Sequence, residues 1–237
     1  MFKKYWKFFV IFWSVVLVGI IGVFVFFWLI SAGKLGFMPT FEELENPNNR
    51  FASEVYFADG PIMNRYFEKE NRKYIEYREI PQSVIDALIA TEDVRFYDHS
   101  GVDVRGLFRV AKGLLTANTS AGGGSTISQQ LAKMLFPRES DLNVFELAIR
   151  KFREWVIAVR LEKSYTKEEI LTMYLNKFDF LNNAVGIKTA ASTYFGCEPK
   201  DLKIEQAAML VGMCQNPSRY NPVSRNPKIR ENALGRR

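Results

Sequence analysis

The stretch "ATEDVRFYDHSGVD", residues 90–103, places two acids, Glu92 and Asp93, where a helix is expected to end. Residues 81–91 carry apolar side chains at helical spacing, and Glu92 continues that apolar stripe. A carboxylate there faces both the core and the negative end of the helix dipole, and both surroundings make it a stronger base. Glu92 is therefore a candidate general base. The alternative is an acid that a basic partner satisfies elsewhere in the fold.

A second unusual stretch is "AGGGSTISQQLAKMLF", residues 121–136, in which three glycines precede Ser125 and Thr126. Thr126 fits the first position of a capping box, so the loop is expected to deliver a helix N-terminus with free backbone N–H groups, which can bind anions. Gln130 and Lys133 share one face of that helix and add an amide and an ammonium. The alternative is a flexible loop with an ordinary helix cap.

A third stretch, residues 142–163, predicts a helix that is apolar on two sides and therefore runs through the core. Glu154 lies in one of its apolar strips, and Arg150, one turn earlier, is its expected partner. The alternative is a purely structural Arg–Glu pair. A solvated face is expected for five charged residues that follow, Glu162, Lys163, Lys167, Glu168 and Glu169.

Residues 8–30 form 23 consecutive residues without a charge, which is enough for a helix to cross a bilayer core of roughly 30 Å. The stretch is too long for the apolar part of a cleaved signal peptide, so we expect an uncleaved anchor. Lys3, Lys4 and Lys7 precede it, and the positive-inside rule places that end in the cytoplasm. Everything after about residue 31 is then expected outside.

The composition fits a globular domain with one sizeable core, since 48% of the 237 residues are hydrophobic and 24% are charged. The net charge of +6 includes the three lysines before the span. A mild basic excess remains without them, which suits work beside anionic headgroups or phosphates. No basic tract interleaves with aromatic residues, so nucleic acid is not an expected partner. Cys197 and Cys214 are not expected to form a disulfide.

Three parts of the chain are expected: a cytoplasmic tail and anchor at 1–31, a linker with a small β module at 32–80, and a mostly α domain at 81–237. The β module rests on alternating residues on both sides of Asp59-Gly60, a hairpin signal. The glycine run 122–124 is the main loop. The periodicity predicts helices near 81–93, 102–116, 125–136, 142–163, 166–176, 184–195 and 204–214.

Two carboxylates in apolar settings, a helix start suited to anions and several cations beside one membrane suggest a particular chemistry. The simplest reaction that uses all of them is sugar transfer from a phosphate-linked lipid. One carboxylate would activate a nucleophilic hydroxyl, and the cations would hold the leaving phosphate.

The same residues carry a resemblance to the peptidoglycan glycosyltransferase family, which occurs as single enzymes and as the first domain of bifunctional penicillin-binding proteins. "ATEDVRFYDHSGVD" resembles the family's ED-x-x-F-x-x-H-x-G motif, "GGSTISQQLAKMLF" its G-x-STI-x-QQ-x-x-KN motif, and "RKFREWVIAVRLEKSYTKEEILTMYLN" its RK-x-x-E segment. "GIKTAASTYFG" and "AAMLVGMCQNPSRYNP" match the remaining two, in order. The resemblance covers about 81–237 and departs at Met134, where the family usually has Asn.

The resemblance implies a lysozyme-like, bilobal fold with the small lobe near the membrane. It implies that Glu92 takes the proton from the acceptor sugar's 4-hydroxyl and that Glu154 supports the departing pyrophosphate, with a divalent cation (Mg or Mn) as its candidate helper. Phosphates would be held by Lys133, Arg150 and Lys151. The remaining residues implied to bind substrate or shape the site are Asp93, Phe96, His99, Ser125, Thr126 and Gln130.

The implied substrate is lipid II, polymerised into a glycan strand with inversion at the anomeric carbon, at the outer side of the bacterial inner membrane. Other cell-wall synthesis proteins are candidate partners. His99 is expected to be a structural hydrogen-bonder because no second histidine exists to share a metal, and Tyr194 and Phe195 are expected to pack in the core. The chain ends at "NALGRR" directly after the fifth motif, so it is expected to be a piece of a longer protein.

Two other functions stay open at this point. A lysozyme-type hydrolase would use a carboxylic acid and a water, but Lys133 and Arg150 would then have no obvious task. A noncatalytic membrane scaffold would not need Glu92 and Glu154 in apolar strips.

Overall fold

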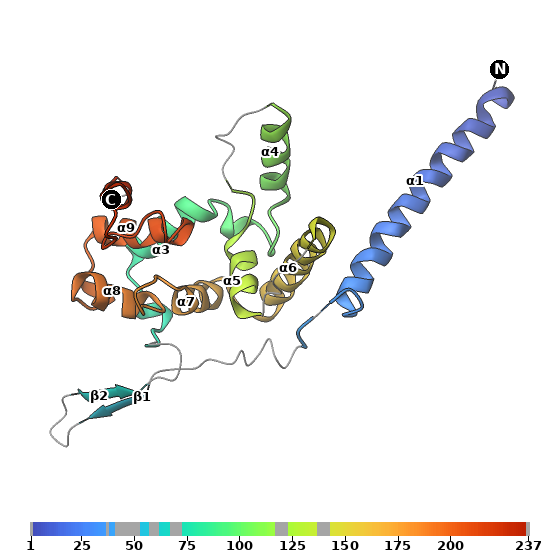
Figure 1. Ribbon diagram of the computed structural model, residues 1–237. Coiled ribbons are helices and arrows are strands. Elements are labelled where there is room, and N and C mark those ends of the chain that lie inside the picture. Colours follow the sequence, from blue (N-terminus) through green and yellow to red (C-terminus); the bar gives the residue numbers. More distant parts are fainter. Residues whose placement is uncertain are drawn as a thin grey trace.

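The computed structural model describes residues 2–36, 38–40, 53–56, 62–66, 73–116, 123–136 and 143–235. It is mostly helical, as predicted (Figure 1). The α-helices are α1 (Phe2–Ser31), α3 (Gln82–Glu92), α4 (Val104–Leu115), α5 (Ile127–Leu135), α6 (Val144–Ser164), α7 (Lys167–Lys177), α8 (Ile187–Phe195), α9 (Ile204–Gln215) and α10 (Pro227–Leu234). Short 3-10 turns are η1 (Tyr77–Glu79), η2 (Phe96–Asp98) and η4 (Pro199–Asp201), and the strands are β1 (Ser53–Tyr56) and β2 (Ile62–Tyr66).

The seven helices predicted after residue 80 are confirmed, with ends that differ from the prediction by at most three residues. The largest difference is at α8, which begins at Ile187 because Gly186 makes a turn at φ +83° that favours glycine. A Cβ at that position would lie 2.9 Å from the carbonyl oxygen of Asn176. Helix α10 was not predicted.

Local capping signals fix where α6 and α7 begin. The Asn143 side chain accepts a hydrogen bond from the Glu146 N–H at 3.0 Å, and the Glu146 carboxylate accepts one from the Asn143 N–H at 2.9 Å. Thr166 and Glu169 form the same reciprocal capping box at α7. The two capping boxes therefore fix the N-terminal ends of α6 and α7.

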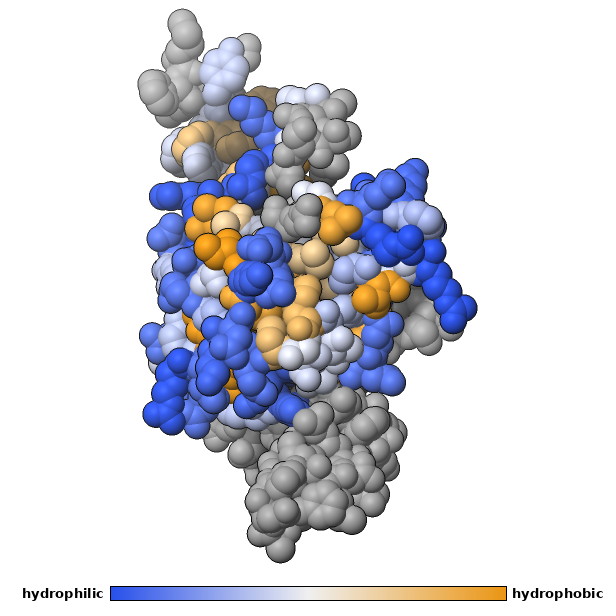
Figure 2. All heavy atoms as spheres, turned by 90° about the vertical axis from the view of Figure 1, so that its left-hand side faces the viewer, coloured by the Kyte–Doolittle hydropathy of each residue, from blue (hydrophilic) through white to orange (hydrophobic). Residues whose placement is uncertain are grey.

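The core lies where α3 packs on α9 and where α5 packs between α6 and α7. Its largest fully buried side chains include Tyr174, Phe96 and Phe180. Tyr194 and Phe195 of α8 pack against this core, as predicted. The face that carries α8 and α9 is mostly hydrophilic, with small apolar patches between charged side chains (Figure 2).

Helix α6 is apolar on two sides, but only one of them faces the core. Ile157, Ala158 and Leu161 are buried there. On the other side, the Phe152 ring contacts Phe26 and Phe27 of α1, with ring centroids 5.3 and 5.7 Å apart. The prediction that α6 runs through the core is therefore wrong for this second side, because the end of α1 covers it.

Helix α1 is the one helix in the described residues that is long and apolar enough to cross a membrane, over Tyr5–Ser31. It extends away from the helical domain, and its C-terminal end lies beside α6 (Figure 1). Arg160 of α6 donates hydrogen bonds to the Ser31 carbonyl at 2.9 Å and to the Pro39 carbonyl at 3.1 Å. In the part of the chain that the structure describes, the anchor candidate is thus joined to the domain at its C-terminal end.

Strands β1 and β2 pair in antiparallel fashion, with Ser53 opposite Tyr66 and an irregularity between Val55 and Tyr56. The intervening residues, with Asp59 and Gly60, lie outside the described part of the chain. The predicted hairpin turn stays a prediction.

Candidate active site

Glu92 is the last residue of α3, and its carboxylate contacts α5, which in turn contacts α7. The Gln130 side-chain amide of α5 donates to Glu92 Oε2 at 2.8 Å. Gln130 Oε1 in turn accepts from the Tyr174 hydroxyl of α7 at 3.0 Å. Burial raises the pKa of Tyr174 well above its usual value, so the phenol stays protonated and keeps donating. This chain of hydrogen bonds fixes one oxygen of the candidate base.

A cavity of about 760 Å³ opens beside this carboxylate. It brings together six of the residues predicted from the sequence: Glu92, Ser125, Gln130, Lys133, Lys151 and Glu154. They come from α3, from the loop before α5, from α5 itself and from α6. These six residues therefore bring two carboxylates and two ammonium groups into one cavity, which suits a proton acceptor working beside a developing negative charge.

Glu154 is paired with Lys151 and not with Arg150, so the expected partner was wrong. Lys151 Nζ lies 3.0 Å from Glu154 Oε2 and donates to Ser125 Oγ at 2.9 Å. Because Lys151 reaches across to the loop before α5, it lines the cavity together with Glu154. Within the described residues, Arg150 forms neither an ion pair nor a hydrogen bond, and it does not line the cavity.

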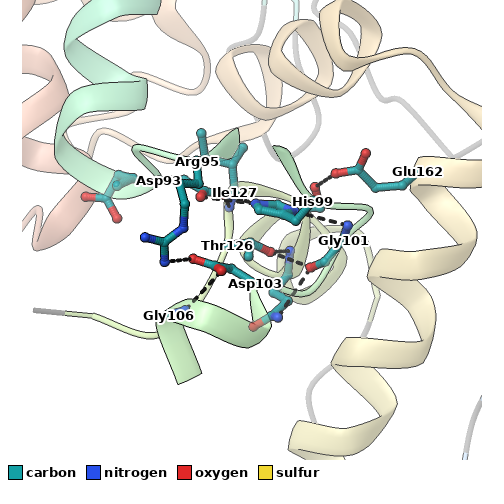
Figure 3. Close-up of polar contacts among 12 residues, drawn as sticks. Asp93, Arg95, His99, Gly101, Asp103, Gly106, Thr126, Ile127 and Glu162 are labelled. Atoms are coloured by element: carbon teal, nitrogen blue, oxygen red, sulfur yellow. Dashed lines mark hydrogen bonds and ion pairs between the residues drawn. The ribbon is translucent and has the colours of Figure 1, made fainter. Parts of the chain in front are cut away.

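Asp93, next to Glu92 in sequence, points into the fold instead. Its side chain is 4% exposed. It accepts hydrogen bonds from His99 Nε2 at 3.0 Å and from the Ile127 N–H at 3.1 Å (Figure 3). Ile127 is the first residue of α5, so Asp93 caps that helix from outside. The Ile127 N–H group, one of the groups expected to be free for a substrate anion, is thus taken by the protein's own carboxylate, and anion binding at this helix N-terminus stays a prediction.

Thr126 is the N-cap of α5, as predicted. Its hydroxyl oxygen accepts from the Gln129 N–H at 3.2 Å and donates to the Gly101 carbonyl at 2.7 Å. The Gln129 side chain also donates to the Gly101 carbonyl, at 3.3 Å. Gly101 has φ +94°, and a Cβ there would lie 2.7 Å from the carbonyl carbon of Ala158. Only glycine lets the 96–101 turn approach α6 this closely.

His99 and Phe96 do not line the large cavity but pack next to residues that shape it. His99 Nδ1 accepts from the Gly101 N–H at 3.2 Å, which leaves the Nε2–H to donate to Asp93. The expectation of a structural hydrogen-bonder is met. Phe96 is fully buried. Asp93 and Thr126 line a smaller cavity of about 110 Å³, which shares Glu92 and Ser125 with the larger one.

Glu162 and Lys167 are not part of a solvated face, so that prediction was wrong for this pair. The Glu162 side chain is 4% exposed, accepts from the Ser128 hydroxyl, and lies 2.7 Å from Lys167 Nζ. Lys167 also donates to the His99 carbonyl at 2.7 Å and lies over the Phe96 ring. The turn between α6 and α7 folds both charges inward. The other three residues, Lys163, Glu168 and Glu169, are exposed as predicted.

Sequence reasoning missed a second set of cavity-lining residues. Lys177 is the last residue of α7, and Phe178, Asp179 and Leu181 follow it. Cys214 and Gln215 are the last two residues of α9, and Pro217 follows that helix. Cys197 and Cys214 are free, as expected. Burial, with the Glu92 charge, raises the pKa of the Cys214 thiol, which therefore stays neutral.

Comparisons with known proteins identify the family of the chain. The transglycosylase family model matches residues 59–236. The chain is 39% identical to penicillin-binding protein 1A of Pseudomonas aeruginosa over 186 residues, 78% of this chain and 22% of that protein. It is 37% identical to penicillin-binding protein 1A of Escherichia coli over 78% of this chain and 21% of that protein. The chain belongs to the transglycosylase family and spans about a fifth of the length of these relatives.

Proposed function

We propose that this chain is a peptidoglycan glycosyltransferase with a lysozyme-like, bilobal domain that polymerises lipid II into glycan strands. The observation that carries the proposal is the cavity in which Glu92, held by Gln130, shares the lining with Lys133 and Lys151. A base next to two cations suits the attack of a hydroxyl on a sugar whose leaving group is a pyrophosphate. Family membership and the similarity to penicillin-binding protein 1A support the same chemistry.

In the proposed reaction, Glu92 takes the proton of the acceptor sugar's 4-hydroxyl. The acceptor oxygen forms a bond to the anomeric carbon of the donor, and the bond from that carbon to the phosphate oxygen breaks, with inversion. The electron pair leaves with the lipid pyrophosphate, whose growing negative charge Lys133 and Lys151 stabilise. Arg150, the third residue expected to hold phosphate, does not line the cavity, and its role is not part of this proposal.

Glu154 is the group that would support the leaving pyrophosphate, directly or through a Mg²⁺ or Mn²⁺ ion. In the described part of the chain, no group of three or more His, Cys, Asp or Glu side chains could hold a metal. Mg²⁺ is commonly held by one or two carboxylates together with substrate phosphates, so Glu154 fits an ion that arrives with the substrate. Such an ion would neutralise phosphate charge together with Lys151, which lies 3.0 Å from Glu154.

We assign α1 as a single-pass anchor in the bacterial inner membrane, with the helical domain on the outer side. The three lysines before the span and its exposed apolar surface support this orientation and placement. A lipid-linked substrate and a lipid-linked growing strand would then lie in the same membrane as the enzyme.

Incubation of the chain with lipid II, followed by sizing of the products, tests the proposed function. Formation of long glycan strands is expected. Shortening of added glycan strands would identify a hydrolase, and no change to either substrate would identify a scaffold. The hydrolase is disfavoured because it would leave Lys133 and Lys151 without a task in the cavity.

A further inference from the structure

Three consecutive residues after α7 adopt a left-handed backbone: Leu181 (φ 64°), Asn182 (φ 50°) and Asn183 (φ 58°). They are the only non-glycine residues with positive φ in the described part of the chain. Asparagine tolerates this conformation because its short polar side chain can hydrogen-bond locally, whereas leucine has no such compensation. Leu181 is therefore the strained member of the turn.

The surrounding structure holds this turn in place. Asp179 Oδ1 accepts from the Leu181 N–H at 2.8 Å, and the Ala184 N–H donates to the Leu181 carbonyl at 2.9 Å. The Asn182 side chain donates to the Tyr194 hydroxyl at 2.8 Å, and that hydroxyl donates to the Phe180 carbonyl. Strain that persists under such restraint tends to collect at functional sites.

Leu181 differs from its two neighbours in one further respect, since it lines the large cavity and they do not. Asn182 and Asn183 are exposed. The residue least suited to the backbone conformation is thus the one that lines the cavity. The strain is accounted for if the leucine side chain is needed in the cavity.

The lining around Leu181 indicates what it would contact. The same cavity is lined by apolar surface from Met134, Phe178 and Pro217 and by polar groups from Lys177, Asp179 and Gln215. Apolar surface with a few polar groups suits a sugar ring, which presents C–H faces and a rim of hydroxyls. A polyprenyl chain would require apolar surroundings throughout.

We propose that Leu181 is a substrate-contacting residue that packs against the C–H face of a sugar ring of lipid II; this inference rests on the proposed function. The strained turn serves to place that side chain. Replacement by a residue suited to the left-handed backbone then relieves the strain and weakens substrate binding at the same time.

Leu181→Asn and Leu181→Gly in the full chain test the proposal, with Asn183→Gly as the matched control in the same turn. Both Leu181 variants are expected to keep or raise Tm, and to raise KM for lipid II polymerisation and Kd for lipid II roughly three- to tenfold. Asn183→Gly should also keep or raise Tm, with KM and Kd unchanged.

Wild-type KM and Kd in both Leu181 variants would overturn the inference, and so would a Tm that falls by several degrees in both, because the leucine would then serve packing. A wild-type chain that binds no lipid II and forms no polymer would instead contradict the proposed function itself. The two failures are therefore distinguishable.

Discussion

Glu92 and Asp93 are neighbours in sequence, yet their side chains belong to two different regions of the molecule. Glu92 belongs to the cavity region, defined by Glu92, Lys133, Lys151 and Glu154, which line the large cavity. Lys133 is exposed, and the Lys151 side chain is 41% exposed. The two ammonium groups of this region therefore remain accessible to a substrate.

Asp93 belongs to the support cluster, defined by Asp93, His99, Thr126, Glu162 and Lys167. Each of these side chains makes at least two polar contacts with other parts of the protein, including the start of α5 and the 96–101 turn (Figure 3). Buried polar groups of this kind are costly unless they are fully paired. The two regions should therefore respond differently to mutation: the cavity region in activity, and the support cluster in stability.

The largest expected effect is at Glu92. Glu92→Gln keeps an oxygen that can accept from Gln130 but removes the base, so polymerisation should fall by about 10²- to 10⁴-fold. Initial rates of lipid II polymerisation measure this, and lipid II binding by the same variant serves as the control. Binding should survive, because the shape of the cavity is unchanged.

In the support cluster, Glu162→Ala should reduce the free energy of unfolding by about 3 to 5 kcal/mol, because it leaves Lys167 without its buried partner. Denaturant unfolding measures the change. Glu168→Ala, which alters an exposed acid on the next helix, is the matched control and should change stability by less than about 0.5 kcal/mol. Equal effects of the two variants would contradict the buried pairing.

Removal of a cation from the cavity region is expected to have a somewhat smaller effect. Lys133→Ala should cost about 2 to 4 kcal/mol of transition-state stabilisation, the range for one preorganised donor, with Tm unchanged. The measurement is kcat/KM for polymerisation, with Lys163→Ala, an exposed lysine at the end of α6, as the control. Near-normal kcat/KM for Lys133→Ala would remove the lysine from the phosphate site.

The smallest expected effect is a pH dependence of stability that arises from Asp103, next to the support cluster. Burial alone would raise the pKa of Asp103, but hydrogen bonds from Arg95 and the Gly106 N–H outweigh it and hold this pKa below its usual value. A lowered pKa in the folded state contributes stability above the unfolded pKa of about 3.9 and loses it as pH falls through the folded value. The stability difference between wild type and Asp103→Asn should thus shrink below about pH 4.

Several features could be predicted because they depend on local sequence. Helix periodicity and caps located α3 to α9, and the position of Glu92 on an apolar stripe placed it at the site. Thr126 was recognised as a cap for the same reason. The membrane-spanning candidate followed from an uninterrupted run of apolar residues.

The features that were missed depend on contacts between distant segments. Asp93 caps a helix that begins 34 residues later in the chain. Lys151, which pairs with Glu154 on the same helix, also reaches Ser125, 26 residues earlier in the chain. Glu162 and Lys167 read as surface residues because their burial comes from the packing of α6 and α7 against the 96–101 turn. Leu181 gave no signal, since a single leucine does not reveal a left-handed backbone.

The most direct test measures both activity and stability for two neighbouring substitutions, Glu92→Gln and Asp93→Ala. Glu92→Gln is expected to abolish lipid II polymerisation with Tm unchanged or raised. Asp93→Ala is expected to lower the free energy of unfolding by about 1 to 3 kcal/mol, since the Ile127 N–H and His99 lose their acceptor, while the folded fraction retains polymerisation. A Glu92→Gln enzyme that still polymerises lipid II, or that unfolds as readily as Asp93→Ala, would contradict the division of the two carboxylates between chemistry and structure.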